Sequence, residues 1–137
     1  MTKTTKFQFN FLVRDSIPTI INSKNNGVKE VSCEYLHDDE EYIQALKDKL
    51  VEESSEVLKS KNKKELIEEI ADVYEVLENL TEANKIDLKK IKQFQQSKNK
   101  TNGSFKDRNF MKYVEVEKGS EAEKYYLSRP EKFKKIK

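Results

Sequence analysis

The stretch that decides the fold is residues 38–83, DDEEYIQALKDKLVEESSEVLKSKNKKELIEEIADVYEVLENLTEA. Apolar side chains recur every three or four residues in both halves, which predicts two amphipathic helices. Because only a few polar residues separate the halves, the two helices should pack antiparallel. The expected buried stripes are Ile43, Leu46, Leu50 and Val57 in the first helix, and Leu66, Ile70, Val73, Leu77 and Leu80 in the second.

Capping residues mark where each of these helices begins. Asp38 with Glu41 resembles a capping box, with Asp in place of Ser or Thr, and Asn62 with Glu65 forms a second such pair. We therefore expect the helices over about residues 38–60 and 62–83.

Outside this stretch the pattern is less regular. Alternation of apolar and polar side chains predicts short strands over residues 6–13, 28–35 and 110–116. Ser16 and Pro18 are typical of the start of a short helix, and Asp87 is expected to cap another that carries Ile91 and Phe94. Residues 97–109 are expected to form a polar loop.

The composition limits the fold class. The chain has 137 residues, of which 35% are hydrophobic and 38% charged, whereas an average globular domain is roughly 45–50% apolar and about 25% charged. We expect a mainly α protein: an antiparallel helical bundle with short accessory β-strands, whose core is completed by dimerisation. The expected domain is residues 1–118, followed by a charged tail over 119–137. In that tail, Tyr125 and Tyr126 would either pack onto the helices or stack on a base.

Several classes of protein are disfavoured. No apolar run approaches the roughly 20 residues that span a bilayer, and residues 1–10 lack the apolar centre of a signal peptide. Cys33 is the single cysteine and His37 the single histidine, so neither an internal disulfide nor a common zinc site is expected. These features predict a cytoplasmic protein with no membrane partner.

Charge is unevenly distributed. Residues 30–91 carry a net charge of −9, while residues 1–29 carry +4 and residues 92–137 carry +7. An acidic centre suits cations, and basic ends suit anions such as phosphates; the alternative is that these are solvated helix faces. Only 3 of the 27 cationic residues are Arg, which makes nucleic acid an unlikely partner because base reading relies on the bidentate Arg fork.

Two pairs of carboxylates stand out on the predicted helices. Glu53 and Glu56 are three residues apart, as are Glu69 and Asp72, so each pair projects from neighbouring positions. At roughly 100° per residue, Glu53 lies about 45° and Glu69 about 70° from the centre of its apolar stripe, and Glu56 and Asp72 lie further round, at about 105° and 130°. Antiparallel packing would bring the four carboxylates together. Mg²⁺ prefers such oxygen ligands, but acidic pairs of this spacing are common on solvated helices.

The acidic pattern, Glu52-Glu53-x-x-Glu56 followed after 12 residues by Glu69-x-x-Asp72, resembles the signature of the all-α nucleoside triphosphate pyrophosphohydrolases, the MazG superfamily. The opening over residues 12–21, LVRDSIPTII, is similar to its small branch described as phosphoribosyl-ATP pyrophosphohydrolase-like or house-cleaning. So are residues 38–42, DDEEY, and Lys98 ahead of Gly103 and Phe105. The resemblance covers about residues 10–110.

The resemblance implies a function as well as a fold. It implies a magnesium-dependent nucleotide pyrophosphohydrolase, with Mn²⁺ as an alternative ion, which cleaves the α–β phosphoanhydride to a nucleoside monophosphate and pyrophosphate. It also implies a homodimer or higher homo-oligomer. The implied metal ligands are Glu53, Glu56, Glu69 and Asp72, with Glu52 as a further catalytic residue and Glu68 nearby. Arg14, Lys98, Lys100 and Arg108 are the candidate phosphate contacts.

Two features leave alternatives open. Relatives usually carry Arg just before the loop glycine, where this chain has Asn102, which cannot supply a charge to phosphate. A nucleotide sensor or sponge that does not hydrolyse its ligand is therefore the alternative function, and a helical interaction module or small nucleic-acid binder that uses the basic tail is a third. Arg14 would either contact substrate or form an ion pair with Asp15.

Overall fold

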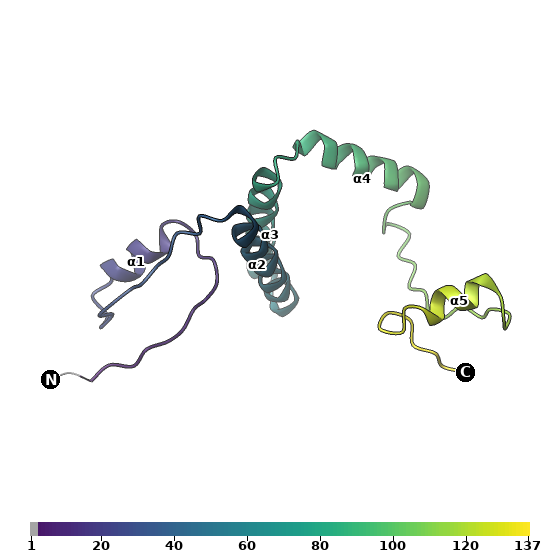
Figure 1. Cartoon of the computed structure of the whole chain (residues 1–137), viewed down its shortest axis with the longest axis horizontal. Helices are drawn as coiled ribbons and strands as arrows, with labels where there is room; N and C mark the ends of the chain where they lie inside the picture. The colour runs from purple at the N-terminus through teal and green to yellow at the C-terminus, as the bar shows by residue number, and fades with distance from the viewer. Residues whose placement is uncertain (1–2) are drawn as a thin grey trace. The chain divides into compact units, whose positions relative to one another are not determined.

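The computed structural model describes residues 3–137, and within these residues every regular element is a helix (Figure 1). The predicted mainly α class is confirmed for this part of the chain. It forms two compact units, one that ends at Lys98 and one that covers Asn99–Lys137. The helices are α1 (Ile17–Ser23), α2 (Asp39–Lys59), α3 (Lys63–Ala83), α4 (Leu88–Asn102) and α5 (Glu121–Leu127).

The start of α2 is fixed by the predicted cap. The carboxylate of Asp38 accepts hydrogen bonds from the backbone N–H groups of Glu40 and Glu41, at 2.9 and 3.4 Å. These N–H groups have no partner inside the helix, so the carboxylate satisfies them and also complements the helix dipole.

The start of α3 is fixed in the same way. The side chain of Asn62 accepts from the N–H of Glu65 at 2.9 Å, and the Glu65 carboxylate accepts in return from the N–H of Lys61 at 2.8 Å. Both predicted long helices therefore begin within a residue of their expected positions, because their caps are local interactions that the sequence specifies directly.

The two long helices pack against each other as an antiparallel hairpin joined by three residues. Leu46 of α2 and Val76 of α3 are 4% and 7% exposed, and they are the buried hydrophobic residues of the described chain. On the predicted stripes, Ile43, Leu50 and Val73 are partly buried. The prediction is wrong for three residues of α3, which are exposed: Leu66, Ile70 and Leu77. The core of the first unit is thus a single seam between two helices.

The predicted strands over 6–13, 28–35 and 110–116 are wrong. All three segments lack regular secondary structure in the described chain. The rings of Phe9 and Phe11 stack with a centroid separation of 5.1 Å, but Asn10 between them has a φ of +51°, which interrupts an extended backbone. A strand also needs a hydrogen-bonded neighbour, and within each unit none of these segments pairs with another.

The predicted polar loop over 97–109 begins later than expected. Asp87 accepts a hydrogen bond from the N–H of Lys89 at 2.9 Å, and α4 then continues to Asn102, where Gly103 adopts a φ of +78°. The run QQSKNKTN carries no strong helix breaker, so the helix ends only where a glycine supplies the left-handed conformation.

The second unit contains a small aromatic cluster. Ser120 caps α5 by accepting from the N–H of Glu123 at 3.2 Å. The rings of Tyr125 and Tyr126 lie 5.9 and 4.8 Å from the ring of Phe133. The tail is therefore folded on itself, and these tyrosines pack on Phe133.

No helix in residues 3–137 combines the length and the apolar character that crossing a membrane would require.

The thin seam makes a direct prediction about stability. Leu46→Ala should lower the free energy of unfolding by about 2–5 kcal/mol, because it opens a cavity between α2 and α3. Leu58→Ala, a matched change on the same helix at a side chain that is 86% exposed, should change it by less than about 0.5 kcal/mol. Urea denaturation followed by circular dichroism measures both values, and equal losses would contradict the assignment of the core.

Candidate functional site

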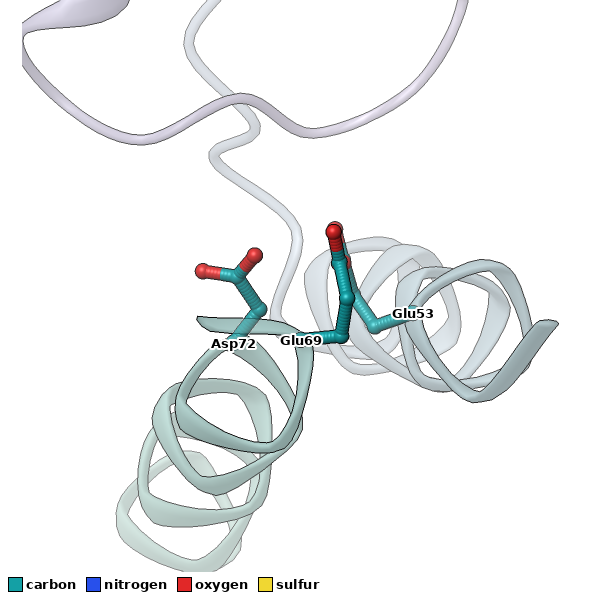
Figure 2. A group of neighbouring side chains, drawn as sticks. All are labelled: Glu53, Glu69 and Asp72. Carbon is teal, nitrogen blue, oxygen red and sulfur yellow. The ribbon is translucent and has the colours of Figure 1, made fainter. Parts of the chain in front are cut away.

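Three carboxylates converge beside the helix seam (Figure 2). Glu53 comes from α2, and Glu69 and Asp72 come from neighbouring positions on α3. One carboxylate oxygen from each residue lies within 4.8 Å of those of the other two, and all three side chains are partly buried. Figure 2 shows the three side chains pointing to the same side of the helix pair. The sequence-predicted meeting of carboxylates from two helices is therefore present for these three residues.

The fourth predicted ligand, Glu56, does not belong to this close group. Its carboxylate lies 3.9 Å from the Lys59 ammonium, and its side chain is about half exposed. Glu56 is still near enough to act on the group electrostatically, since it is among the charges that raise the pKa of Glu69.

The pKa of Glu69 is raised above its ordinary value of 4.5. Partial burial is the main cause, followed by repulsion from Asp72, Glu56, Glu53 and Glu68. Each of these causes disfavours the charged form of the carboxyl group. A cation at this position would reverse both effects, because it would replace the lost solvation and offset the repulsion.

Two cationic side chains of the chain itself already face the carboxylates. Arg14 Nη2 donates a 2.7 Å hydrogen bond to Asp72 Oδ1, and this contact joins the segment before α1 to α3. Lys49 Nζ lies 3.0 Å from Glu52 Oε2 and 3.5 Å from Glu53 Oε1. The ion pair of Arg14 is therefore with Asp72, and Glu52 turns toward Lys49 rather than into the group.

Lys49 is not among the site residues predicted from the sequence. Its signal was present, because Lys49 precedes Glu52 by three residues and Glu53 by four, which is the spacing of facing side chains on a helix. Its ammonium also lies 4.7 Å from the centroid of the Phe11 ring, a contact that no local pattern indicates.

A surface groove of about 540 Å³ adjoins Arg14. Its other lining residues belong to α3: Ile67, Ile70, Ala71, Tyr74, Glu75 and Glu78. The groove is open to solvent rather than enclosed, and Arg14 borders both the groove and the carboxylates.

The remaining candidate phosphate contacts lie elsewhere in the chain. Lys98 and Lys100 are exposed on α4, Arg108 is exposed in the loop that follows, and Lys100 and Arg108 belong to the second unit. Asn102 is the last residue of α4. The roles of these residues stay predictions.

Comparison of the chain with family models, curated proteins and solved structures returned no match.

The raised pKa of Glu69 predicts a pH-dependent stability. Between pH 4.5 and the raised pKa, the folded chain binds more protons than the unfolded chain, so this residue lowers stability as the pH rises through that range. Glu69→Gln removes this contribution. In metal-free buffer, the Glu69→Gln variant should therefore melt at a higher temperature than the parent. The difference between the two melting temperatures should grow from pH 4 to pH 7.

Glu34→Gln is the matched control, because Glu34 is exposed and lies outside the helices. Its effect should vary little with pH. A constant margin for Glu69→Gln across the same range would contradict the prediction.

Proposed function

We propose that this chain is a magnesium-dependent nucleotide pyrophosphohydrolase of the MazG-like type. It would cleave the α–β phosphoanhydride of a nucleoside triphosphate or a related nucleotide to a monophosphate and pyrophosphate. The observation that carries the proposal is the convergence of Glu53, Glu69 and Asp72 from two helices, with the guanidinium of Arg14 beside them.

The donor set fits a hard divalent cation. Mg²⁺ binds oxygen ligands at about 2.0–2.1 Å in an octahedron, so its neighbouring ligands lie about 3 Å apart and its opposite ligands about 4 Å apart. The three carboxylate oxygens lie within 4.8 Å of one another, and small side-chain rotations would bring them to these separations. Mn²⁺ takes similar ligands.

The residues of the chain then have separate roles. Glu53, Glu69 and Asp72 would hold the ion, and Glu56 would join them by leaving Lys59. Glu52 would orient the attacking water as a base once Lys49 is drawn away by substrate phosphate. When bound, Mg²⁺ supplies charge neutralisation of the phosphates and positioning for the displacement.

The groove beside Arg14 supports a nucleotide as the substrate class. Its apolar side chains Ile67 and Tyr74 suit a base, because aromatic and aliphatic side chains stack on and cover a flat ring. Arg14, at the border between groove and carboxylates, is suited to the phosphate that would lie there.

The test is a product assay. The purified chain is incubated with a panel of canonical, deoxy and modified nucleoside triphosphates, with and without Mg²⁺, and the products are separated. We expect monophosphate and pyrophosphate only in the presence of the ion. Glu53→Gln and Asp72→Asn should each lower kcat/KM at least about a hundredfold, because loss of an outer partner of a metal ligand alone typically costs 10–100-fold.

Glu34→Gln is again the matched control, and it should keep parental activity. Retained turnover in both Glu53→Gln and Asp72→Asn would contradict the assignment. Tight nucleotide binding without any product would instead favour the nucleotide sensor, for which Asn102 in place of the expected Arg is the motivating feature.

We further propose that a second copy of the chain completes the core. Leu66, Ile70 and Leu77 form an apolar stripe of α3 next to the groove, and each is at least 37% exposed. Lys63 and Lys64 lie at the start of α3, and Glu78 and Glu82 lie near its end. If two copies of α3 pack antiparallel about a twofold axis, the lysines of each copy lie beside the glutamates of the other at both ends of the contact.

Analytical ultracentrifugation tests this dimer. Leu77→Glu should shift the chain from dimer to monomer, because it would bury a charge in the apolar stripe. Leu58→Glu, at an exposed leucine of α2, should leave the dimer intact. A parent chain that sediments as a monomer at micromolar concentration would refute the second copy.

A further inference from the structure

Arg14 links the segment before α1 to a carboxylate of α3. Its guanidinium makes a 2.7 Å ion pair with Asp72, and the two side chains are 56% and 35% exposed. The pair joins residues 58 positions apart in the chain, so it does not follow from helix spacing. The nearby charges of Glu75 and Glu53 also favour the cationic guanidinium.

A second contact attaches the same segment to α2. The ring of Phe11 lies 4.7 Å below the Lys49 ammonium, which itself pairs with Glu52 and Glu53. Leu12 and Val13, between these two contacts, are partly buried. The segment from Phe11 to Arg14 therefore contacts both helices, through the Lys49 ammonium of α2 at one end and the Asp72 carboxylate of α3 at the other.

The Arg14 pair is suited to exchange. An exposed ion pair contributes little net stability, since solvent screens it and both side chains lose freedom. A divalent ion brings twice the charge of a guanidinium to the same carboxylate. The freed guanidinium would remain at the edge of the groove, where its planar fork matches the oxygens of a phosphate.

We propose that Arg14 is an internal counter-ion that exchanges with the divalent cation: it neutralises Asp72 until the cation binds, and it then moves to a phosphate of the nucleotide. This inference rests on the proposed metal site. It adds an order of events, in which the ion binds first and its arrival releases the residue that contacts the substrate.

Mn²⁺ binding measured by titration calorimetry tests the competition. Arg14→Gln should bind Mn²⁺ roughly two- to fivefold more tightly than the parent, as expected from the small free energy of an exposed ion pair. Arg129→Gln, a matched change in the second unit, should bind Mn²⁺ as the parent does. Arg14→Lys keeps the charge and should also remain close to the parent.

The same substitution should weaken nucleotide binding, although it strengthens Mn²⁺ binding. With Mn²⁺ saturating, Arg14→Gln should bind a non-hydrolysable nucleoside triphosphate more weakly than the parent. A purely structural role for Arg14 would weaken both ligands together, so unchanged or weaker Mn²⁺ binding in Arg14→Gln, with the helical content preserved by circular dichroism, overturns the proposal.

The exchange can also be observed without any substitution. The chain contains three arginines, Arg14, Arg108 and Arg129, so its guanidinium Nε–H region contains three nuclear magnetic resonance signals. Titration with Mg²⁺ should shift the Arg14 signal and leave those of Arg108 and Arg129 in place. If the parent binds Mn²⁺ and Mg²⁺ competes for the same site while the Arg14 signal does not move, the exchange is refuted and the metal site stands. If the parent binds neither ion, the metal site is refuted and the exchange with it.

Discussion

The antiparallel contact between α2 and α3 is the constraint on which the rest of the first unit depends. Leu46 precedes Glu53 by seven residues, and Val76 follows Glu69 by seven. An antiparallel register that puts Glu53 next to Glu69 therefore also puts Leu46 next to Val76, two helical turns away. The seam that excludes water from the core thus sets the separation of the carboxylates, so a slip of the register would disturb the core and the candidate site together.

The same contact has an electrostatic consequence. It partly buries Glu69 and brings other acidic side chains close to it, and both effects raise the pKa of Glu69, which is unfavourable for the folded chain at neutral pH. Arg14 and Lys49 reduce this repulsion from two directions, one through Asp72 and the other through Glu52 and Glu53. A bound divalent ion would do the same more effectively. The cationic side chains of the protein thus neutralise the clustered carboxylates only in part, and such partly compensated charge clusters are typical of functional sites.

The small core is the other feature of note. The described chain buries two hydrophobic residues. Their burial supplies little free energy to offset the conformational entropy that the chain loses on folding. The exposed apolar stripe of α3 provides the surface that additional packing would use. The groove beside Arg14 lies along this stripe, so a partner that covered Leu66 and Leu77 would also add a wall to the groove. In our proposal, assembly and substrate binding therefore share one helix.

The sequence by itself determined the helices and the composition of the site. Asp38 and Asn62 fix where α2 and α3 begin through bonds to residues two or three positions away, and the spacing of Glu69 and Asp72 puts both carboxylates on one side of α3. The tertiary structure decided what depends on distant partners. The alternating segments found no neighbouring strand, Arg14 paired with Asp72 rather than with Asp15, and Glu56 was left outside the close group while Asp72 was included. The physical reason is range: capping and helical spacing act within one turn, whereas strand pairing and ion pairs between segments require the folded chain to bring their partners together.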